Sequence, residues 1–252
     1  MSKKTKKNFK ENGRMHKQGN VVHPTFMDDT NWHPLDDEID RARDKSYVKT
    51  VRPRTDGQRD LMEAIASHNL TMAIGPAGTG KTYLAICAAV EALEKGKVDK
   101  IILSRPAMEA GESLGYLPGD MHEKMAPYLR PLYDALGDRL GGKKVRQYMD
   151  EGTIEIAPVG FMRGRTLNNA FIVIDEAQNC TYGQLKMLLS RLGWNSTMVV
   201  TGDPGQSDLL PGVSGLDEVS TKFEALPNIA VVRLKQADIV RHPLVAEMLE
   251  VL

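Results

Sequence analysis

The sequence predicts an α/β fold in which helices flank a mostly parallel sheet. From residue 51 onward, short apolar runs bounded by Gly or Pro alternate with segments of helical period. One of these runs leads directly into a glycine-rich segment and then a helix, and another ends in two adjacent carboxylates. Strands and helices that alternate in this way are typical of a parallel sheet, because each crossover between parallel strands needs a long connection.

The length and composition fit one domain of ordinary size with an appendage. The chain has 252 residues, and 41% of them are hydrophobic, which is enough for a packed core. Its longest apolar runs fall far short of the roughly 20 residues of a membrane span, and its basic N-terminus lacks the apolar segment of a secretory signal. The two cysteines, Cys87 and Cys180, form no metal-binding or disulfide pattern. We therefore expect a cytoplasmic protein with no membrane partner.

Charge separates the N-terminal part from the rest of the chain. Residues 1–18 carry seven basic groups and one acid, residues 28–40 carry six acids and no base, and the remaining residues are balanced. We expect residues 1–50 to be a charged, largely irregular tail and residues 51–252 to form one domain. Residues 1–18, the basic arm, are either a solvated tail or a contact for nucleic-acid phosphates. The net charge of zero therefore neither supports nor excludes a nucleic-acid partner.

The domain is expected to contain six strands. In chain order, these are Leu70–Ile74, Lys100–Ser104, Thr153–Ala157, Ala170–Ile174, Thr197–Thr201 and Ile229–Arg233. The segment 111–150 is rich in Gly, Pro and charged residues, and we expect a helix in it at Met121–Leu136.

A phosphate-binding loop is predicted directly after the first strand. The segment Gly75-Pro76-Ala77-Gly78-Thr79-Gly80-Lys81-Thr82 fits G-x-x-x-x-G-K-[ST], and an apolar helix at Tyr83–Lys95 follows it. Glycines let backbone N–H groups approach phosphates, and the helix N-terminus adds a favourable dipole. We expect Lys81 to reach the β- and γ-phosphates and Thr82 to ligate Mg²⁺. The loop therefore predicts ATP and Mg²⁺ as ligands, since no N-K-x-D-like motif for guanine is present.

Two adjacent carboxylates follow the fourth predicted strand. Phe171–Ile174 leads straight into Asp175 and Glu176. Asp175 would lie beside the metal, and Glu176 would orient or deprotonate an attacking water. P-loop kinases transfer the phosphoryl group to a bound hydroxyl and need no carboxylate to activate water. The Asp175–Glu176 pair therefore favours hydrolysis over phosphoryl transfer to a substrate. The alternative is an ordinary acidic turn at the end of a strand.

Two glutamines are further candidates for the nucleotide site. Gln206 follows the fifth strand in Gly202-Asp-Pro-Gly-Gln206, at the end of the strand that faces the ligand crevice in open α/β sheets, and could sense the γ-phosphate. The alternative is a Gly-Pro turn in which Asp203 caps a helix. Gln58, 17 residues before Gly75, either reads adenine or is a plain surface residue.

These motifs together resemble the PhoH-like family of P-loop ATPases. The segments GPAGTGKT, FIVIDEAQN, VVTGDPGQSD and IVRHPLV occur in the family's order, with EAGESLGYLPGDMHEKMAPYLRPLYDAL and GFMRGRTL between them. The resemblance extends from about Arg52 to the C-terminus. It implies a RecA-like sheet similar to the core of superfamily 1 helicases, with ATP hydrolysis and, in some members, unwinding of RNA or DNA.

The resemblance also implies roles for individual residues. Asp175 and Glu176 would be the metal-side and catalytic carboxylates, and Gln206 the γ-phosphate sensor. Arg241 matches a candidate arginine finger or sensor, and its alternative is a surface arginine that caps the last helix. Arg163 and Arg165 are further candidates for the finger, or would face nucleic acid instead.

A helicase core closes two ATPase domains around one nucleotide, whereas this chain has room for one such domain. We therefore expect a homo-oligomer. An arginine from the opposite face would then come from a neighbouring subunit of a closed ring, which we expect to be a hexamer. We expect single-stranded RNA or DNA as a partner, with basic and aromatic residues available for a track. Those residues are Arg105, Tyr116, Tyr128, Arg130 and Phe161. A nucleotide-gated binding or assembly module with slow hydrolysis and a P-loop kinase are the alternative functions.

Overall fold

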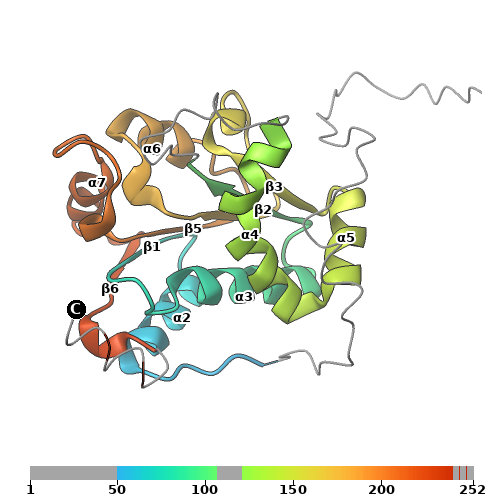
Figure 1. The fold of residues 1–252 in the computed structure, drawn as a ribbon, viewed down its shortest axis with the longest axis horizontal. Helices are drawn as coiled ribbons and strands as arrows, with labels where there is room; N and C mark the ends of the chain where they lie inside the picture. The colour runs from blue at the N-terminus through green and yellow to red at the C-terminus, as the bar shows by residue number, and fades with distance from the viewer. Residues whose placement is uncertain (1–49, 107–120, 241–243, 245–247, 249–252) are drawn as a thin grey trace, which may run out of the picture. The chain divides into compact units, whose positions relative to one another are not determined.

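In a computed structural model, residues 50–106 and 121–240 are described, together with the single positions 244 and 248. Six strands form one sheet in the order β3-β2-β4-β5-β1-β6, and the paired strands run parallel (Figure 1). Their bounds are β1 Leu70–Ile74, β2 Lys100–Arg105, β3 Ile154–Pro158, β4 Ala170–Ile174, β5 Thr197–Gly202 and β6 Ala230–Arg233. The predicted α/β fold is confirmed, and each predicted strand is found within one residue at either end.

Helices cover both faces of the sheet. The α-helices are α2 Asp56–Ser67, α3 Lys81–Glu94, α4 Met121–Leu140, α5 Gly142–Asp150, α6 Tyr182–Leu189 and α7 Leu216–Phe223, and the short 3₁₀ helices are η2 Val159–Met162, η3 Ala177–Asn179, η4 Pro204–Gln206 and η5 Gln236–Asp238. In Figure 1, α2 and α3 lie on one side of the strands, whereas α6 and α7 lie on the other. Within the described ranges, no helix combines the length and the apolar character that a membrane span requires.

The strands contribute alternate residues to two separate cores. In β4, Phe171 and Val173 pack in the core that includes α3 and α4, whereas Ile172 packs with Leu185 and Leu188 of α6. All five residues of β1 and of β4 are buried, as expected for parallel strands covered on both faces. Burial of each large aliphatic side chain contributes roughly 1.5–3 kcal/mol, so this sheet is a rigid base for the loops that follow its strands.

Several helices differ from the sequence-based expectation: α3 begins two residues before the predicted start, and no specific residues were predicted for α5, α6 and α7. α4 continues to Leu140, one turn beyond the predicted end, because Leu136 and Leu140 are both buried on its inner face. α2 was not predicted. It begins where the Thr55 side chain accepts a hydrogen bond from the backbone N–H of Gln58, and it packs against α3 and β6.

The strand order brings four chain segments to one edge of the sheet. The phosphate loop follows β1, the paired carboxylates follow β4, the Gly-Asp-Pro-Gly-Gln segment overlaps the end of β5, and Arg105 ends β2. Because all strands are parallel, their carboxyl ends meet at this edge, which is where ligands bind in open α/β sheets. β5 lies between β1 and β4, so its final residues can contact both neighbouring loops.

Candidate nucleotide site

The loop between β1 and α3 requires glycine at particular positions. Gly78 and Gly80 have φ angles of 83° and 84°, a conformation that favours glycine. A Cβ on Gly75 would lie 2.5 Å from the backbone oxygen of Leu234, so a side chain there would collide with the chain that follows β6. The loop lines a cavity of about 260 Å³, together with Lys81, Thr82, the carboxylate pair and the end of β5.

Lys81 points back into this loop. Its Nζ donates hydrogen bonds to the backbone oxygens of Gly75 at 2.7 Å and of Pro76 at 2.8 Å. Burial lowers the pKa of Lys81 from its ordinary value, and the neighbouring carboxylates, Asp203 foremost, oppose this shift. A buried cation is therefore held among the loop's backbone groups, where a phosphate would offset its cost of desolvation.

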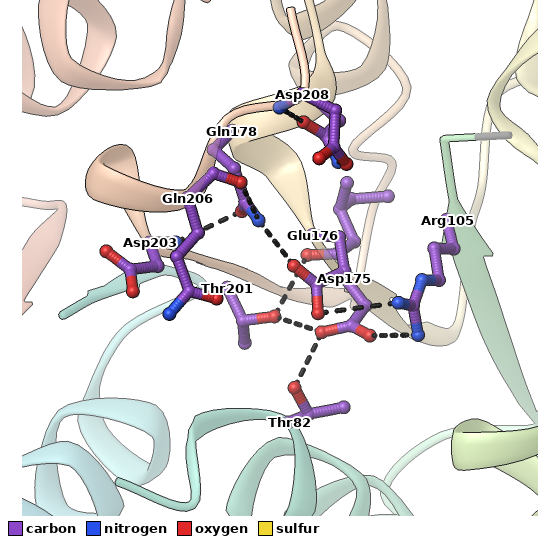
Figure 2. Close-up of polar contacts among 11 residues, drawn as sticks. Thr82, Arg105, Asp175, Glu176, Gln178, Thr201, Asp203, Gln206 and Asp208 are labelled. Carbon is purple, nitrogen blue, oxygen red and sulfur yellow. Dashed lines mark hydrogen bonds and ion pairs between the residues drawn. The ribbon is translucent and has the colours of Figure 1, made fainter. Parts of the chain in front are cut away.

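The Asp175 carboxylate is fixed by two hydroxyl groups. Its Oδ1 accepts hydrogen bonds from Thr82 Oγ1 at 2.6 Å and from Thr201 Oγ1 at 2.7 Å (Figure 2). Asp175 is 2% exposed, and its backbone N–H donates to the oxygen of Ser104 on β2. Mg²⁺ prefers oxygen ligands and commonly takes one or two from the protein, with phosphates and waters completing its shell. Thr82 and Asp175 supply suitable oxygens beside the phosphate loop, so these residues fit the ion.

Glu176 adopts an unusual backbone conformation beside this pair. Its φ of 52° and ψ of 41° lie in the left-handed region, which costs a residue other than glycine on the order of 1–3 kcal/mol. Its carboxylate lines the cavity and accepts a hydrogen bond from Gln178 Nε2. Its other oxygen lies 3.5 Å from Arg105 Nη2. The surrounding contacts therefore hold Glu176 in a defined orientation at the cavity wall.

The segment after β5 connects the phosphate loop with Glu176. The Asp203 carboxylate accepts hydrogen bonds from the backbone N–H groups of Ala77 at 3.2 Å and Gly205 at 3.0 Å. The backbone N–H of Asp203 donates to Gln178 Oε1 at 3.0 Å, and Gln178 in turn binds Glu176. The prediction that Asp203 caps a helix is confirmed by η4, and Asp203 also contacts the phosphate loop, while the contact of Gln206 with a γ-phosphate stays a prediction.

The two candidate glutamines lie in different surroundings. The exposed Gln206 lines the cavity, on the wall opposite Arg105 in Figure 2. Gln58 is only 5% exposed, so its interpretation as a plain surface residue is wrong. Gln58 Nε2 donates to the oxygen of Thr79 at 3.0 Å, and Gln58 Oε1 accepts from the N–H of Arg54. Gln58 therefore binds the backbone of the phosphate loop through Thr79. Its contact with adenine stays a prediction.

The candidate arginines are only partly within the described residues. Arg241 lies outside them. Arg163 is exposed, whereas Arg165 forms a bidentate ion pair with Glu155, with N–O distances of 2.5 and 2.7 Å. Arg165 is thus bound within its own chain.

The residues expected to form a nucleic-acid track lie in different surroundings. Arg105 is 20% exposed at the side chain and faces Asp175 and Glu176 of the candidate nucleotide site, and its contact with nucleic acid stays a prediction. Arg130 and Phe161 are exposed, and Phe161 retains 43% of its surface. Tyr128 is partly buried, and Tyr116 lies outside the described residues.

Sequence reasoning missed three polar residues of the site. Arg105, Gln178 and Thr201 contact the paired carboxylates from β2, η3 and β5. Each lies at or just after the carboxyl end of an apolar strand, which was the available signal. That signal could not show which of the strand ends are neighbours.

The chain is similar to several known proteins. The family model described as "PhoH-like protein" matches residues 50–252. A "PhoH-like protein" of Bacillus subtilis (strain 168) is 54% identical over 203 residues, covering 80% of this chain and 64% of that protein. A "PhoH-like protein" of Synechocystis sp. is 52% identical over 241 residues, covering 91% and 73% respectively. "Protein PhoH" of Escherichia coli (strain K12) is 45% identical over 209 residues, covering 82% and 59%.

One solved structure has a similar fold. The large terminase of a thermophilic bacteriophage matches with a TM-score of 0.52 and 11% sequence identity, covering 79% of this chain and 50% of that one. At this identity the likeness concerns the fold alone. The parallel sheet, the phosphate loop and the carboxylate pair together give the fold of a P-loop NTPase.

Proposed function

The chain belongs to the family of PhoH-like proteins, and from that premise we propose that it is a Mg²⁺-dependent ATPase. The observation that carries this proposal is the contact between Thr82 of the phosphate-loop helix and Asp175, with Glu176 on the wall of the same cavity. A nucleotide held by the loop would bring its γ-phosphate to both carboxylates. The chain spans 64% of the length of its Bacillus subtilis relative.

Each residue has a separate task in the proposed reaction. The loop N–H groups and Lys81 bind the phosphates, while Thr82 and Asp175 would hold Mg²⁺, which would offset phosphate charge. Glu176 orients the attacking water and accepts its proton. A bond forms between the water oxygen and the γ-phosphorus, the bond from that phosphorus to the bridging oxygen breaks, and ADP and phosphate leave. Gln206 contacts the γ-phosphate and responds to its loss.

Glu176→Gln tests the hydrolytic assignment. The variant keeps a side chain of the same size but cannot accept a proton, so we expect ATP binding to persist and phosphate release to fall about 10²–10⁴-fold. Glu224→Gln, which removes an exposed carboxylate paired with Arg233, is the matched control. Unchanged turnover in Glu176→Gln would remove this residue from the role of base. Phosphate that appears on a small acceptor would favour the kinase alternative.

We further propose that hydrolysis is coupled to single-stranded RNA or DNA. The exposed Phe161 and Arg163 lie on and next to η2, which follows β3, at the same edge of the sheet as the nucleotide site. An aromatic ring and a guanidinium are suited to stacking on bases and pairing with phosphates. Phosphate release should rise several-fold with one class of strand, and the effect should weaken as salt increases. Slow turnover that no strand changes would favour the nucleotide-gated binding module.

The proposed assembly is a homo-oligomeric ring, with six subunits and a nucleotide at each subunit boundary. Its support is that the described residues form one P-loop core, whereas a second surface is needed to enclose the open side of the cavity. In this arrangement Arg241 of one subunit would act on the nucleotide of its neighbour. Mass measurement of the protein with ATP and Mg²⁺ tests the proposal, and a monomer at micromolar concentration would reject it.

A further inference from the structure

Arg105 contacts both carboxylates of the candidate site. It is the last residue of β2, and β2 pairs directly with β4, the strand that leads into Asp175. Arg105 Nη1 lies 3.6 Å from Asp175 Oδ2, and Arg105 Nη2 lies 3.5 Å from Glu176 Oε1. Figure 2 shows the guanidinium bridging the two side chains. One cation thus faces two neighbouring anions.

Arg105 contacts the Asp175 carboxylate through the oxygen that does not bind Thr82. Asp175 uses its other oxygen to bind Thr82, so the Asp175 carboxylate lies between Arg105 and Thr82 (Figure 2). The cavity is lined by Asp175 and Glu176, whereas Arg105 lies outside its lining. Among the described residues, the contacts of Arg105 at this site are therefore with the carboxylates that line the cavity.

The guanidinium has a physical effect on Glu176. Two adjacent carboxylates repel each other, and the Glu176 side chain is 35% exposed, so it would be free to turn towards solvent. Arg105 holds one carboxylate oxygen, and Gln178 Nε2 holds the other. Two contacts from opposite sides restrict the carboxylate to a single orientation at the cavity wall.

We propose that Arg105 is a positioning residue for ATP hydrolysis: it fixes the Glu176 carboxylate in the orientation that directs the attacking water. This role rests on the proposed ATPase function. It acts within one chain, and it differs from that of an arginine that contacts the γ-phosphate. It follows that loss of Arg105 lowers kcat and leaves the affinity for ATP nearly unchanged.

The first test compares Arg105→Ala, Arg105→Lys and a control, Arg233→Ala. Arg233 is also an arginine at the end of a strand with an acidic partner, Glu224, but that partner lies at the end of α7. We expect kcat of Arg105→Ala to fall about 10–100-fold, as for other residues that orient a reactive group. The dissociation constant of Mg²⁺·ATP, measured by direct titration, should change less than about twofold. Arg105→Lys should recover part of kcat, since it keeps the charge but cannot bridge two carboxylates in the same way.

A double-mutant cycle with Glu176→Gln separates positioning from general destabilisation. If Arg105 acts through Glu176, adding Arg105→Ala to Glu176→Gln should reduce the residual single-turnover rate far less than it reduces the wild-type rate. Additive effects would overturn the proposal, as would a rise in kcat, an unchanged kcat, or weaker ATP binding in Arg105→Ala. If Arg105→Ala fails to fold, Arg105→Lys carries the same cycle. A wild-type protein without ATPase activity would reject the proposed function itself, and the positioning role with it.

Discussion

Replacing Thr201 by Val removes one of the two hydroxyl groups that hold the Asp175 carboxylate. Thr201 is fully buried, its Oγ1 lies 2.7 Å from Asp175 Oδ1, and Val has nearly the same shape and β-branching. The variant therefore keeps the side-chain volume and loses the hydrogen bond to Asp175, together with the longer contact of the same hydroxyl, at 3.5 Å, with the backbone oxygen of Ile174. A hydrogen bond to a charged group contributes about 1.5–3 kcal/mol, and a remaining carboxylate that is less well satisfied adds to the cost. We expect the free energy of unfolding to fall by about 2 kcal/mol.

The chain supplies a matched control on the neighbouring strand. Thr71 of β1 is also fully buried, but its hydroxyl has no hydrogen-bond partner among the described residues. Thr71→Val removes a buried polar group that lacks a partner, so it should leave stability unchanged or raise it by about 1 kcal/mol.

Urea and thermal unfolding without nucleotide measure both variants. For a domain of this size, a loss of about 2 kcal/mol lowers Tm by about 4–8 °C, so Thr201→Val should be clearly separated from Thr71→Val. Equal effects of the two substitutions would refute the reasoning, because burial and shape would then explain the result without Asp175. A neutral Thr201→Val would show that its hydroxyl does not hold the carboxylate.

Three further predictions concern other parts of the chain. Lys81→Ala should abolish ATP hydrolysis measured as phosphate release, and full turnover would reject the assignment of the phosphate loop. Hydrogen bonds, chiefly from the backbone N–H of Lys235, hold the pKa of Asp238 below its ordinary value of about 4. The stability that Asp238 contributes should therefore be present above that value and be lost as pH falls through the lower, folded-state pKa. Urea unfolding measured from neutral to acid pH should show a weaker pH dependence of the free energy of unfolding for Asp238→Asn than for the wild type. Identical profiles for the two proteins would contradict this assignment. Deletion of residues 1–18 should weaken polymer binding and reduce its salt dependence with basal ATPase intact, and an unchanged salt slope would assign no contact to the basic arm.

The strands could be predicted from sequence because their burial is complete. β1 and β4 are covered by helices on both faces, so every position is apolar except Thr71, which is β-branched. Each strand therefore appears in the sequence as a continuous apolar run that can be recognised without an alternating pattern. The phosphate loop and the carboxylate pair were equally accessible, since each is a local sequence that follows such a run. α2 was missed because only three of its twelve residues are buried, which leaves a weak apolar pattern.

Contacts between motifs could not be predicted, because they depend on which strands are neighbours. Arg105 and Asp175 are 70 positions apart in the sequence, and β3 lies between their strands along the chain but not in the sheet. The sequence therefore left Arg105 as a residue after a strand, with nucleic acid as one plausible contact. Only the pairing of β2 with β4 brings its guanidinium to the carboxylates.

Register completes the site in the same way. Ala73 of β1 pairs with Thr201 of β5, and Ile174 of β4 pairs with Val200, so β5 is locked between the strands that carry the loop and the carboxylates. A slip of one residue in β5 would turn Thr201 to the opposite face of the sheet, away from Asp175. It would also displace Asp203, which reaches Ala77 of the phosphate loop. The buried apolar residues of β5 thus fix the register that gives Asp175 its second hydroxyl, and the core of the sheet specifies the geometry of the site as much as the motifs do.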